Sequence, residues 1–207
     1  LLLHSGYLTL DWEKTDEAEL SKDSKTNKEV FAKIPNLEIL ECFENNIKER
    51  FGNVVKKDNL ALNIANALLD GNADFVLDKL EPLLRSFVSV RDTATKAPQE
   101  NYYHGFLNGI FTNCKDDIGK YHSNYESGDG YADIIFNDLG GTKACVIEIK
   151  VCKEKESRAK KANEAIDQII DKHYVDTILE DENITTVTAV GIAFYAKNCA
   201  VACKKIK

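Results

Sequence analysis

An apolar run, ACVIEIKVC, occupies residues 144–152 and contains two charged residues, Glu148 and Lys150, set two positions apart. Such a run predicts a buried β-strand, in which successive side chains point to opposite faces. Glu148 and Lys150 therefore share one face, while Ile147 and Ile149 share the other. Ionisable groups in an apolar setting cost free energy unless a partner offsets their charge. The charged pair on a rigid strand therefore suggests a reaction centre.

The hydrophobic spacing around this strand predicts alternating helices and strands from residue 99 onward. Glycine-containing segments mark turns at 128–130 and 140–141. In chain order, the prediction is a helix over about 102–111, strands over about 120–126, 131–136 and 144–152, a helix over about 157–179, and a strand within 185–197, with space for one further strand. This αβββαβ order predicts an α/β (α+β) fold with a mixed central sheet flanked by helices.

The first 98 residues follow a different pattern. Two short strands, Gly6–Leu10 and Val30–Ile34, are predicted on either side of a long polar loop. Helical spacing then predicts helices over about 37–51, 60–70 and 73–88. No polar groups converge within an apolar frame here. We therefore interpret residues 1–98 as a helical, wing-like packing or adaptor region, and residues 99–207 as a second domain.

The net charge of −7 over 207 residues argues against a protein that coats nucleic acid by bulk electrostatics. It does not exclude a nuclease, because the metal site of a nuclease is itself acidic. A local basic stretch runs from Lys150 to Lys161. This stretch could hold a phosphate backbone, although a solvated helix start is the simpler interpretation.

Six cysteines form no CxxC pair and no zinc-type spacing with the four histidines. Reduced thiols in a cytoplasmic protein fit this pattern best. No apolar run approaches the roughly 18 residues that span a bilayer, so no membrane association is expected. The chain opens with LLLHSGYLTL, without an initiator methionine or a signal-peptide pattern, which favours a fragment of a longer polypeptide.

A second acid, Asp133, lies within the apolar segment ADIIF of the preceding predicted strand. A hairpin would pair the two strands, so Asp133 and Glu148 can approach each other at one end of the sheet. Two carboxylates repel unless a cation lies between them, and Mg²⁺ prefers oxygen ligands. Lys150 could steady a water or the charge of a pentavalent phosphate. Metal activation of water, combined with stabilisation of the transition-state charge, is how phosphodiesters are hydrolysed, although a D…ExK pattern alone arises by chance in many sequences.

Five segments carry a family resemblance: NYYHGFLNGIF, YESGDGYADII, VIEIK, AIDQIIDKHY and GIAFYAKNCAV. Through them, residues 102–201 resemble the PD-(D/E)XK nuclease superfamily, and more narrowly the bacterial nuclease-like domains that follow an AAA-ATPase-like region. The resemblance implies a restriction-endonuclease-like core at 99–207. LLLHSGYLTL and VFAKIPNLEI are similar to the end of the ATPase-like region, which implies an ATPase-like portion upstream in the same polypeptide. The chain has no GxxxxGK phosphate-binding loop of its own.

The resemblance also implies roles for individual residues. Asp133 and Glu148 would be ligands of Mg²⁺ (or Mn²⁺), and Lys150 would be the catalytic lysine. Glu126 corresponds to an additional acid of the family, and Gln168 to a glutamine that orients water or substrate.

Each of these residues also has a structural interpretation that the sequence leaves open. Glu126 could begin a turn, and Asp133 could be an acid at a sheet edge. Glu148 and Lys150 could form a structural ion pair. Gln168 could be an ordinary helix residue.

The chain departs from the family pattern at two positions. Many relatives carry arginine, which contacts phosphate, where this chain has Tyr125 and Tyr131. The first hypothesis is a Mg²⁺-dependent nuclease that hydrolyses nucleic-acid phosphodiesters, with DNA as the expected substrate. The alternative is a catalytically weak nuclease-fold module that binds nucleic acid or a protein partner. A third hypothesis is a structural adaptor working through residues 1–98.

Overall fold

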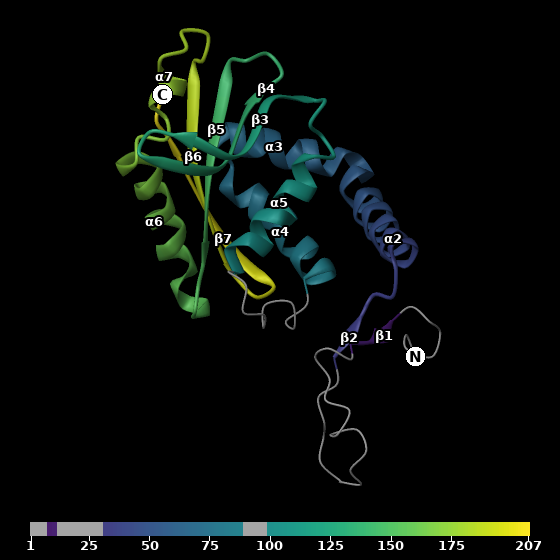
Figure 1. Cartoon of the computed structure of the whole chain (residues 1–207). Helices are drawn as coiled ribbons and strands as arrows, with labels where there is room; N and C mark the ends of the chain where they lie inside the picture. The colour runs from purple at the N-terminus through teal and green to yellow at the C-terminus, as the bar shows by residue number, and fades with distance from the viewer. Residues whose placement is uncertain (1–7, 12–30, 89–98) are drawn as a thin grey trace. The chain divides into compact units, whose positions relative to one another are not determined.

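The computed structural model describes residues 8–11, 31–88 and 99–207, without the side chains of residues 40–48 and 50. The chain divides into two compact units, Leu1–Phe51 and Gly52–Lys207. The second unit contains the central sheet and every element that positions the candidate site (Figure 1).

The first unit contains a short antiparallel pair, β1 (Thr9–Leu10) and β2 (Ala32–Lys33). These lie within the two predicted strands, whose remaining ends fall partly outside the described residues. Helix α2 (Leu37–Lys56) follows, and the side chain of Asn36 accepts a hydrogen bond of 2.9 Å from the backbone N–H of Ile39 at its start. This helix runs five residues past the predicted end at residue 51 and is continued by a 3₁₀ turn over Lys57–Asn59.

The second unit is built on a five-stranded mixed sheet with the order β3-β4-β5-β6-β7. The strands are β3 (Ile118–Ser127), β4 (Gly130–Asp138), β5 (Lys143–Val151), β6 (Thr186–Tyr195) and β7 (Asn198–Lys205). Strands β5 and β6 run parallel, and the other neighbours are antiparallel. The predicted α+β fold with a mixed central sheet is therefore confirmed, including the further strand at the end.

Five helices flank this sheet: α3 (Leu60–Asp70), α4 (Ala73–Phe87), α5 (Gln99–Phe111), α6 (Arg158–Asp171) and α7 (Asp176–Leu179). One face is covered by α3, α4 and α5, and the other by α6 and α7 (Figure 1). On the α5 face, the Tyr103 ring stacks on Phe194 with ring centroids 4.3 Å apart. On the α6 face, Ile166 and Ile169 pack against the sheet.

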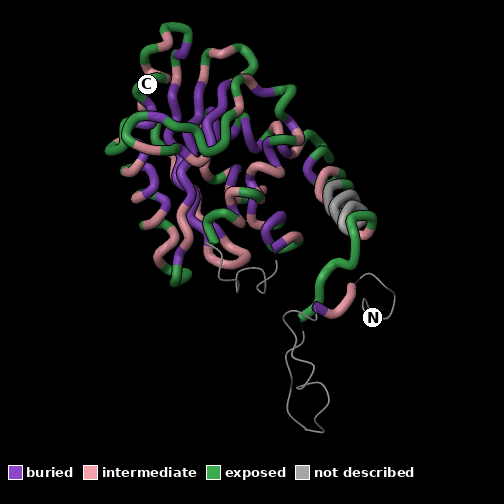
Figure 2. Tube along the Cα trace, in the orientation of Figure 1, coloured by how far each residue is buried: buried purple, intermediate pink, exposed green. Residues whose placement is uncertain are grey.

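Burial follows this layering. The central strands β5 and β6 carry almost continuous buried residues (Figure 2), as expected for strands covered on both faces. The five described cysteines, at positions 114, 145, 152, 199 and 203, form no disulfide. Among the described residues, no helix combines the length and apolarity that a membrane-spanning segment requires.

The predicted single helix over 157–179 is wrong in one respect, because the chain breaks it after Asp171. His173 takes a positive φ of 58°. The carbonyl of Lys172 accepts a hydrogen bond of 2.9 Å from the N–H of Asp129 in the β3–β4 turn. Gly128 in that turn has φ 55°, and a Cβ there would lie 2.2 Å from the Lys172 carbonyl oxygen. The β3–β4 turn thus occupies the Lys172 carbonyl, which would accept an intrahelical hydrogen bond if the helix continued.

Candidate active site

The site forms where the hairpin of β4 and β5 opens. Ladder pairing between these strands extends from Asn137↔Ala144 to Ile134↔Ile147. Beyond this pair, β5 bonds to a side chain of β4. Oδ2 of Asp133 accepts a hydrogen bond of 2.7 Å from the backbone N–H of Ile149. Strand β5 itself stays paired with β6 as far as Val151. The opening therefore places Asp133 beside Glu148 without loosening the central strand.

Glu148, Lys150 and Gln168 form a closed triangle of hydrogen bonds. Lys150 Nζ lies 2.9 Å from Glu148 Oε1 and donates to Gln168 Oε1 at 2.5 Å. Gln168 Nε2 donates to the same Glu148 Oε1 at 2.6 Å. Glu148 is 5% exposed, and its second oxygen, Oε2, is buried with no hydrogen-bond partner among the described residues. One carboxylate oxygen is therefore held in place and the other is left for a ligand.

Gly191 of β6 allows α6 to lie close enough to the sheet for Gln168 to contact Glu148. Gly191 is the ladder partner of Glu148. A Cβ at Gly191 would lie 1.8 Å from the carbonyl oxygen of Ala162, which is a backbone atom of α6. Any side chain at this position would push the helix away from the sheet. The lack of a side chain at Gly191 therefore sets the distance between α6 and the sheet, on which the contacts of Gln168 depend.

The electrostatics of the site disfavour two bare carboxylates. Burial raises the pKa of Glu148 to about 7, and the charge of Asp133 adds to this rise, while Lys150 opposes it. Burial also raises the pKa of Asp133, although the hydrogen bond from Ile149 and the charges of His104 and Lys150 act in the other direction. A nearby cation would stabilise the charged form of both buried acids.

Sequence reasoning missed one residue of α5, Glu100. The charge of Glu100 adds to the rise in the pKa of both Asp133 and Glu148, although burial is the largest cause of each rise. Glu100 lies in the first turn of α5, whereas the predicted helix began at Tyr102. His104 Nε2 lies 3.0 Å from the carbonyl oxygen of Asp133 and thereby fixes the β4 backbone at the opening. The signal for Glu100 was an acid just after Pro98, where helices commonly begin.

The structure places Glu126 apart from these contacts. It is exposed on β3, opposite Tyr131, and its side chain makes no hydrogen bond or ion pair with the described residues. Tyr131 and Tyr125 are both exposed as well, at 60% and 41%. The additional-acid role of Glu126 stays a prediction.

The basic stretch after β5 is partly committed to internal contacts. Arg158 donates to the carbonyl of Cys199 at 3.2 Å. Lys160 and Lys161 both pair with Glu164, at 3.9 and 2.5 Å. The lysines at positions 153 and 155 are exposed and form no ion pair within the described part of the chain. A solvated helix start therefore accounts for most of the stretch.

The donor set fits a divalent cation with few protein ligands. Among residues 8–11, 31–88 and 99–207, no group of three or more His, Cys, Asp or Glu side chains converges into a ready-made cage. Mg²⁺ commonly binds one or two carboxylates and completes its shell with waters and substrate phosphate. The unpartnered Oε2 of Glu148, with the carboxylate of Asp133 beside it, offers such a set.

Comparison with known proteins agrees with this geometry. No curated protein sequence matches the chain significantly. A sequence profile described as the PD-(D/E)XK nuclease superfamily matches residues 98–204, which is more than half of the chain and includes α5, α6 and, except for Lys205, the five-stranded sheet. Proteins of this superfamily generally depend on a divalent metal. The chain belongs to the PD-(D/E)XK nuclease superfamily.

Proposed function

We propose that residues 99–207 form a Mg²⁺-dependent nuclease domain that hydrolyses DNA phosphodiester bonds, with Mn²⁺ as a substitute metal. The observation that carries the proposal is the meeting of Asp133, Glu148 and Lys150 where β4 and β5 separate. Membership of a nuclease superfamily supports the reaction class. The choice of DNA follows the resemblance of the five segments within residues 102–201. The separate resemblance of LLLHSGYLTL and VFAKIPNLEI supports an ATPase-like region upstream in the polypeptide.

Asp133 and Glu148 would hold the cation, which would neutralise phosphate charge and lower the pKa of the attacking water. Lys150 carries a positive charge 2.9 Å from Glu148 Oε1, so it lies next to the metal ligands. There it would stabilise the negative charge that develops on the phosphate in the transition state. Gln168 holds both Lys150 and Glu148 in place and acts as a positioning residue.

Plasmid nicking tests the proposal. Supercoiled DNA would be incubated with the protein in Mg²⁺, in Mn²⁺ and in EDTA, alongside an RNA of matched sequence. We expect nicking in either metal and none in EDTA. Lys150→Ala and Glu148→Gln should each slow nicking about 100-fold or more, since each removes charge acting on the transition state. Lys115→Ala, an exposed lysine in the turn after α5, is the matched control and should retain full activity.

Two results would overturn the proposal. Nicking at wild-type rate in both site variants would remove Glu148 and Lys150 from the reaction. DNA binding without cleavage at every metal concentration would instead support the alternative of a nuclease-fold binding module. Cleavage of the RNA but not the DNA would keep the reaction and correct the substrate.

A further inference from the structure

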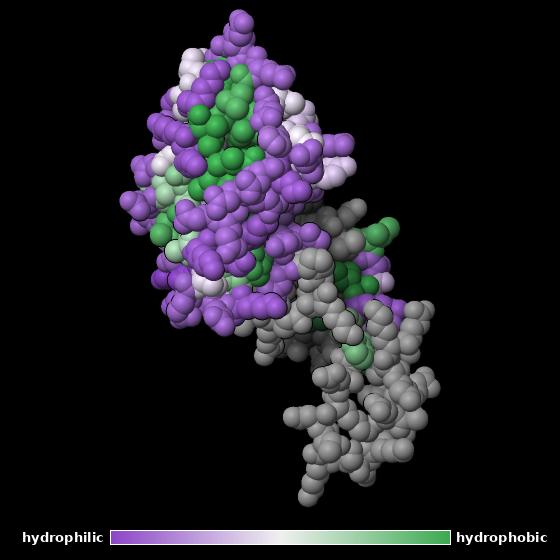
Figure 3. Space-filling model, turned by 90° about the vertical axis from the view of Figure 1, so that its left-hand side faces the viewer, coloured by the Kyte–Doolittle hydropathy of each residue, from purple (hydrophilic) through white to green (hydrophobic). Residues whose placement is uncertain are grey.

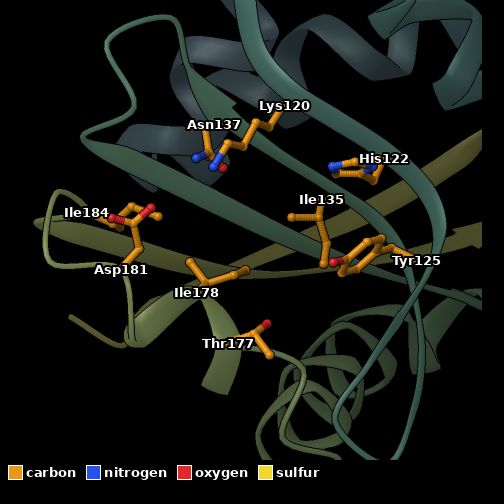
Figure 4. A pocket seen from close by; sticks show the side chains of 9 residues that line it. All are labelled: Lys120, His122, Tyr125, Ile135, Asn137, Thr177, Ile178, Asp181 and Ile184. Carbon is orange, nitrogen blue, oxygen red and sulfur yellow. The ribbon is translucent and has the colours of Figure 1, made fainter.

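A pocket of about 160 Å³ lies on the α6–α7 face of the sheet, between the edge strand β3 and helix α7 (Figure 4). Its walls come from β3, β4, α7 and the loop after α7. The lining residues are Lys120, His122, Tyr125, Ile135, Asn137, Thr177, Ile178, Asp181 and Ile184. None of them belongs to the proposed metal site.

Two aromatic rings form one side of the pocket. His122 and Tyr125 have ring centroids 4.7 Å apart and planes tilted by 36°. Residues three apart on a regular strand point to opposite faces. Between them, however, Asn124 adopts a left-handed conformation with φ 52°. This irregularity turns both rings toward the same face, where Tyr125 remains 41% exposed. The rings therefore present an accessible aromatic surface.

Asn137 provides a buried polar group that points into the same pocket (Figure 4). It is only 6% exposed. Its side-chain amide makes no hydrogen bond with any described residue. The Asn137 amide keeps some contact with solvent through the pocket, so its donor and its acceptor are accessible to a ligand. An amide that presents both a donor and an acceptor here matches the edge of a nucleobase.

The remaining lining residues favour a neutral, flat ligand. Ile135, Ile178 and Ile184 supply aliphatic contacts, and a hydrophobic patch lies among hydrophilic residues on the side of the unit where α6 and α7 lie (Figure 3). Lys120 and Asp181 contribute one cation and one carboxylate, so their formal charges cancel. A site with no net charge suits a polar aromatic ring better than a bare phosphate.

We propose that this pocket binds one unpaired nucleobase of the nucleic-acid substrate. His122 and Tyr125 stack on the face of the base, and Asn137 reads its edge. Proteins that bind single strands use this combination of aromatic stacking and edge contacts. Residues 135 and 137 lie two and four positions along β4 from Asp133, which is about 7 and 13 Å at strand spacing. The pocket is thus within a few nucleotides of the cleaved bond. The inference rests on the proposed function only in taking the base from the nuclease substrate.

Binding of free nucleotides tests the inference without cleavage. The four nucleoside 5′-monophosphates would be titrated into the ¹⁵N-labelled protein in EDTA, with ribose 5-phosphate as the ligand that lacks a base. We expect at least one nucleotide to shift the side-chain amide signal of Asn137, which is identified by its loss in Asn137→Asp. The double variant His122→Ala/Tyr125→Ala should bind about tenfold or more weakly, since base–aromatic stacking is lost.

Both ring residues are exposed, so their removal should leave the fold intact, which thermal unfolding would check. Leu139→Ala, at a 71% exposed position in the β4–β5 turn, is the control and should bind like the wild type. Equal binding of ribose 5-phosphate, or nucleotide binding unchanged in the double variant, would overturn the inference, as would no binding of any nucleotide. Nucleotide binding in a protein that nicks no plasmid would sustain the pocket and refute only the proposed nuclease.

Discussion

The backbone N–H of Ile149 donates to Oδ2 of Asp133 at 2.7 Å, just beyond Ile134↔Ile147, the last ladder pair of β4 and β5. The hydrogen bond replaces a strand-to-strand contact with a contact to a carboxylate. Backbone pairing between β4 and β5 therefore ends at the site. The hydrogen bond orients the Asp133 side chain through Oδ2 and does not involve Oδ1. The same opening brings Glu148 and Asp133 close enough for the charge of Asp133 to raise the pKa of Glu148.

The first prediction concerns the pH dependence of stability in the metal-free protein. Glu148 has a pKa of about 7 in the folded protein against 4.5 as its ordinary value. Between these values the folded state binds more protons than the unfolded state, so stability should fall as the pH rises. The loss is absent below about pH 4.5, complete above about pH 7, and on the order of 3 kcal/mol at 1.36 kcal/mol per unit.

Denaturant unfolding in EDTA at pH 5 and pH 8 measures this loss. Glu148→Gln has no carboxylate to ionise and should lose correspondingly less stability between the two pH values. Added Mg²⁺ should restore stability to the wild type at pH 8 but not to the variant, because a ligand of the folded state stabilises it. Identical pH dependence in the two proteins would show that Glu148 is not held in its protonated form.

The second prediction separates Glu100 from Glu126. The negative charge of Glu100 raises the pKa of Glu148, so Glu100→Gln should let Glu148 ionise at lower pH. Glu126→Gln removes an acid of the same type from an exposed position on β3 and should leave that titration unchanged. Carboxyl ¹³C NMR of the metal-free protein follows the titration directly. If the pKa of Glu148 fell in Glu126→Gln and stayed unchanged in Glu100→Gln, the result would support Glu126 as the additional acid.

The strands of the second unit could be predicted well because each carries a strong local pattern. The run over 144–152 has apolar residues on both faces, and β5 (Lys143–Val151) differs from it by one residue at each end. The site pair Asp133 and Glu148 followed from the hairpin alone. Gln168 followed from the resemblance, and its helix position suits contact with the sheet because it lies beside the buried Ile169.

The features that escaped prediction depend on contacts between distant residues. The end of α6 requires Asp129 to bond to the carbonyl of Lys172, which no local pattern in the helix reveals. Glu100 was missed because the apolar spacing of α5 begins at Tyr102 and the polar first turn carries no periodic signal. The shared face of His122 and Tyr125 depends on the positive φ of Asn124, a residue whose conformation the sequence does not specify.

The third prediction tests Gln168 as a positioning residue. Gln168→Ala removes a donor to Glu148 and an acceptor for Lys150 while leaving both of these residues in place. Loss of such a supporting contact typically costs about 10–100-fold in metal affinity or activity. We expect the Mg²⁺ concentration for half-maximal nicking to rise and the maximal rate to fall. Asp167→Ala, at the exposed neighbouring position, is the control. Equal losses in the two variants would mean that only helix stability had changed.

The fourth prediction concerns the contact of α6 with the sheet. Gly191→Ala places a Cβ 1.8 Å from the Ala162 carbonyl oxygen, so α6 must move and carry Gln168 away from Glu148. Overpacking costs about 1–3 kcal/mol or more, which denaturant unfolding would measure, and nicking should fall in the fraction that remains folded. Gly105→Ala is the matched control, because a Cβ there meets nothing within 4 Å. Inside helix α5 it should instead stabilise the protein by about 0.5–1 kcal/mol. Full stability and activity in Gly191→Ala would show that the close approach of α6 does not set the geometry of the site.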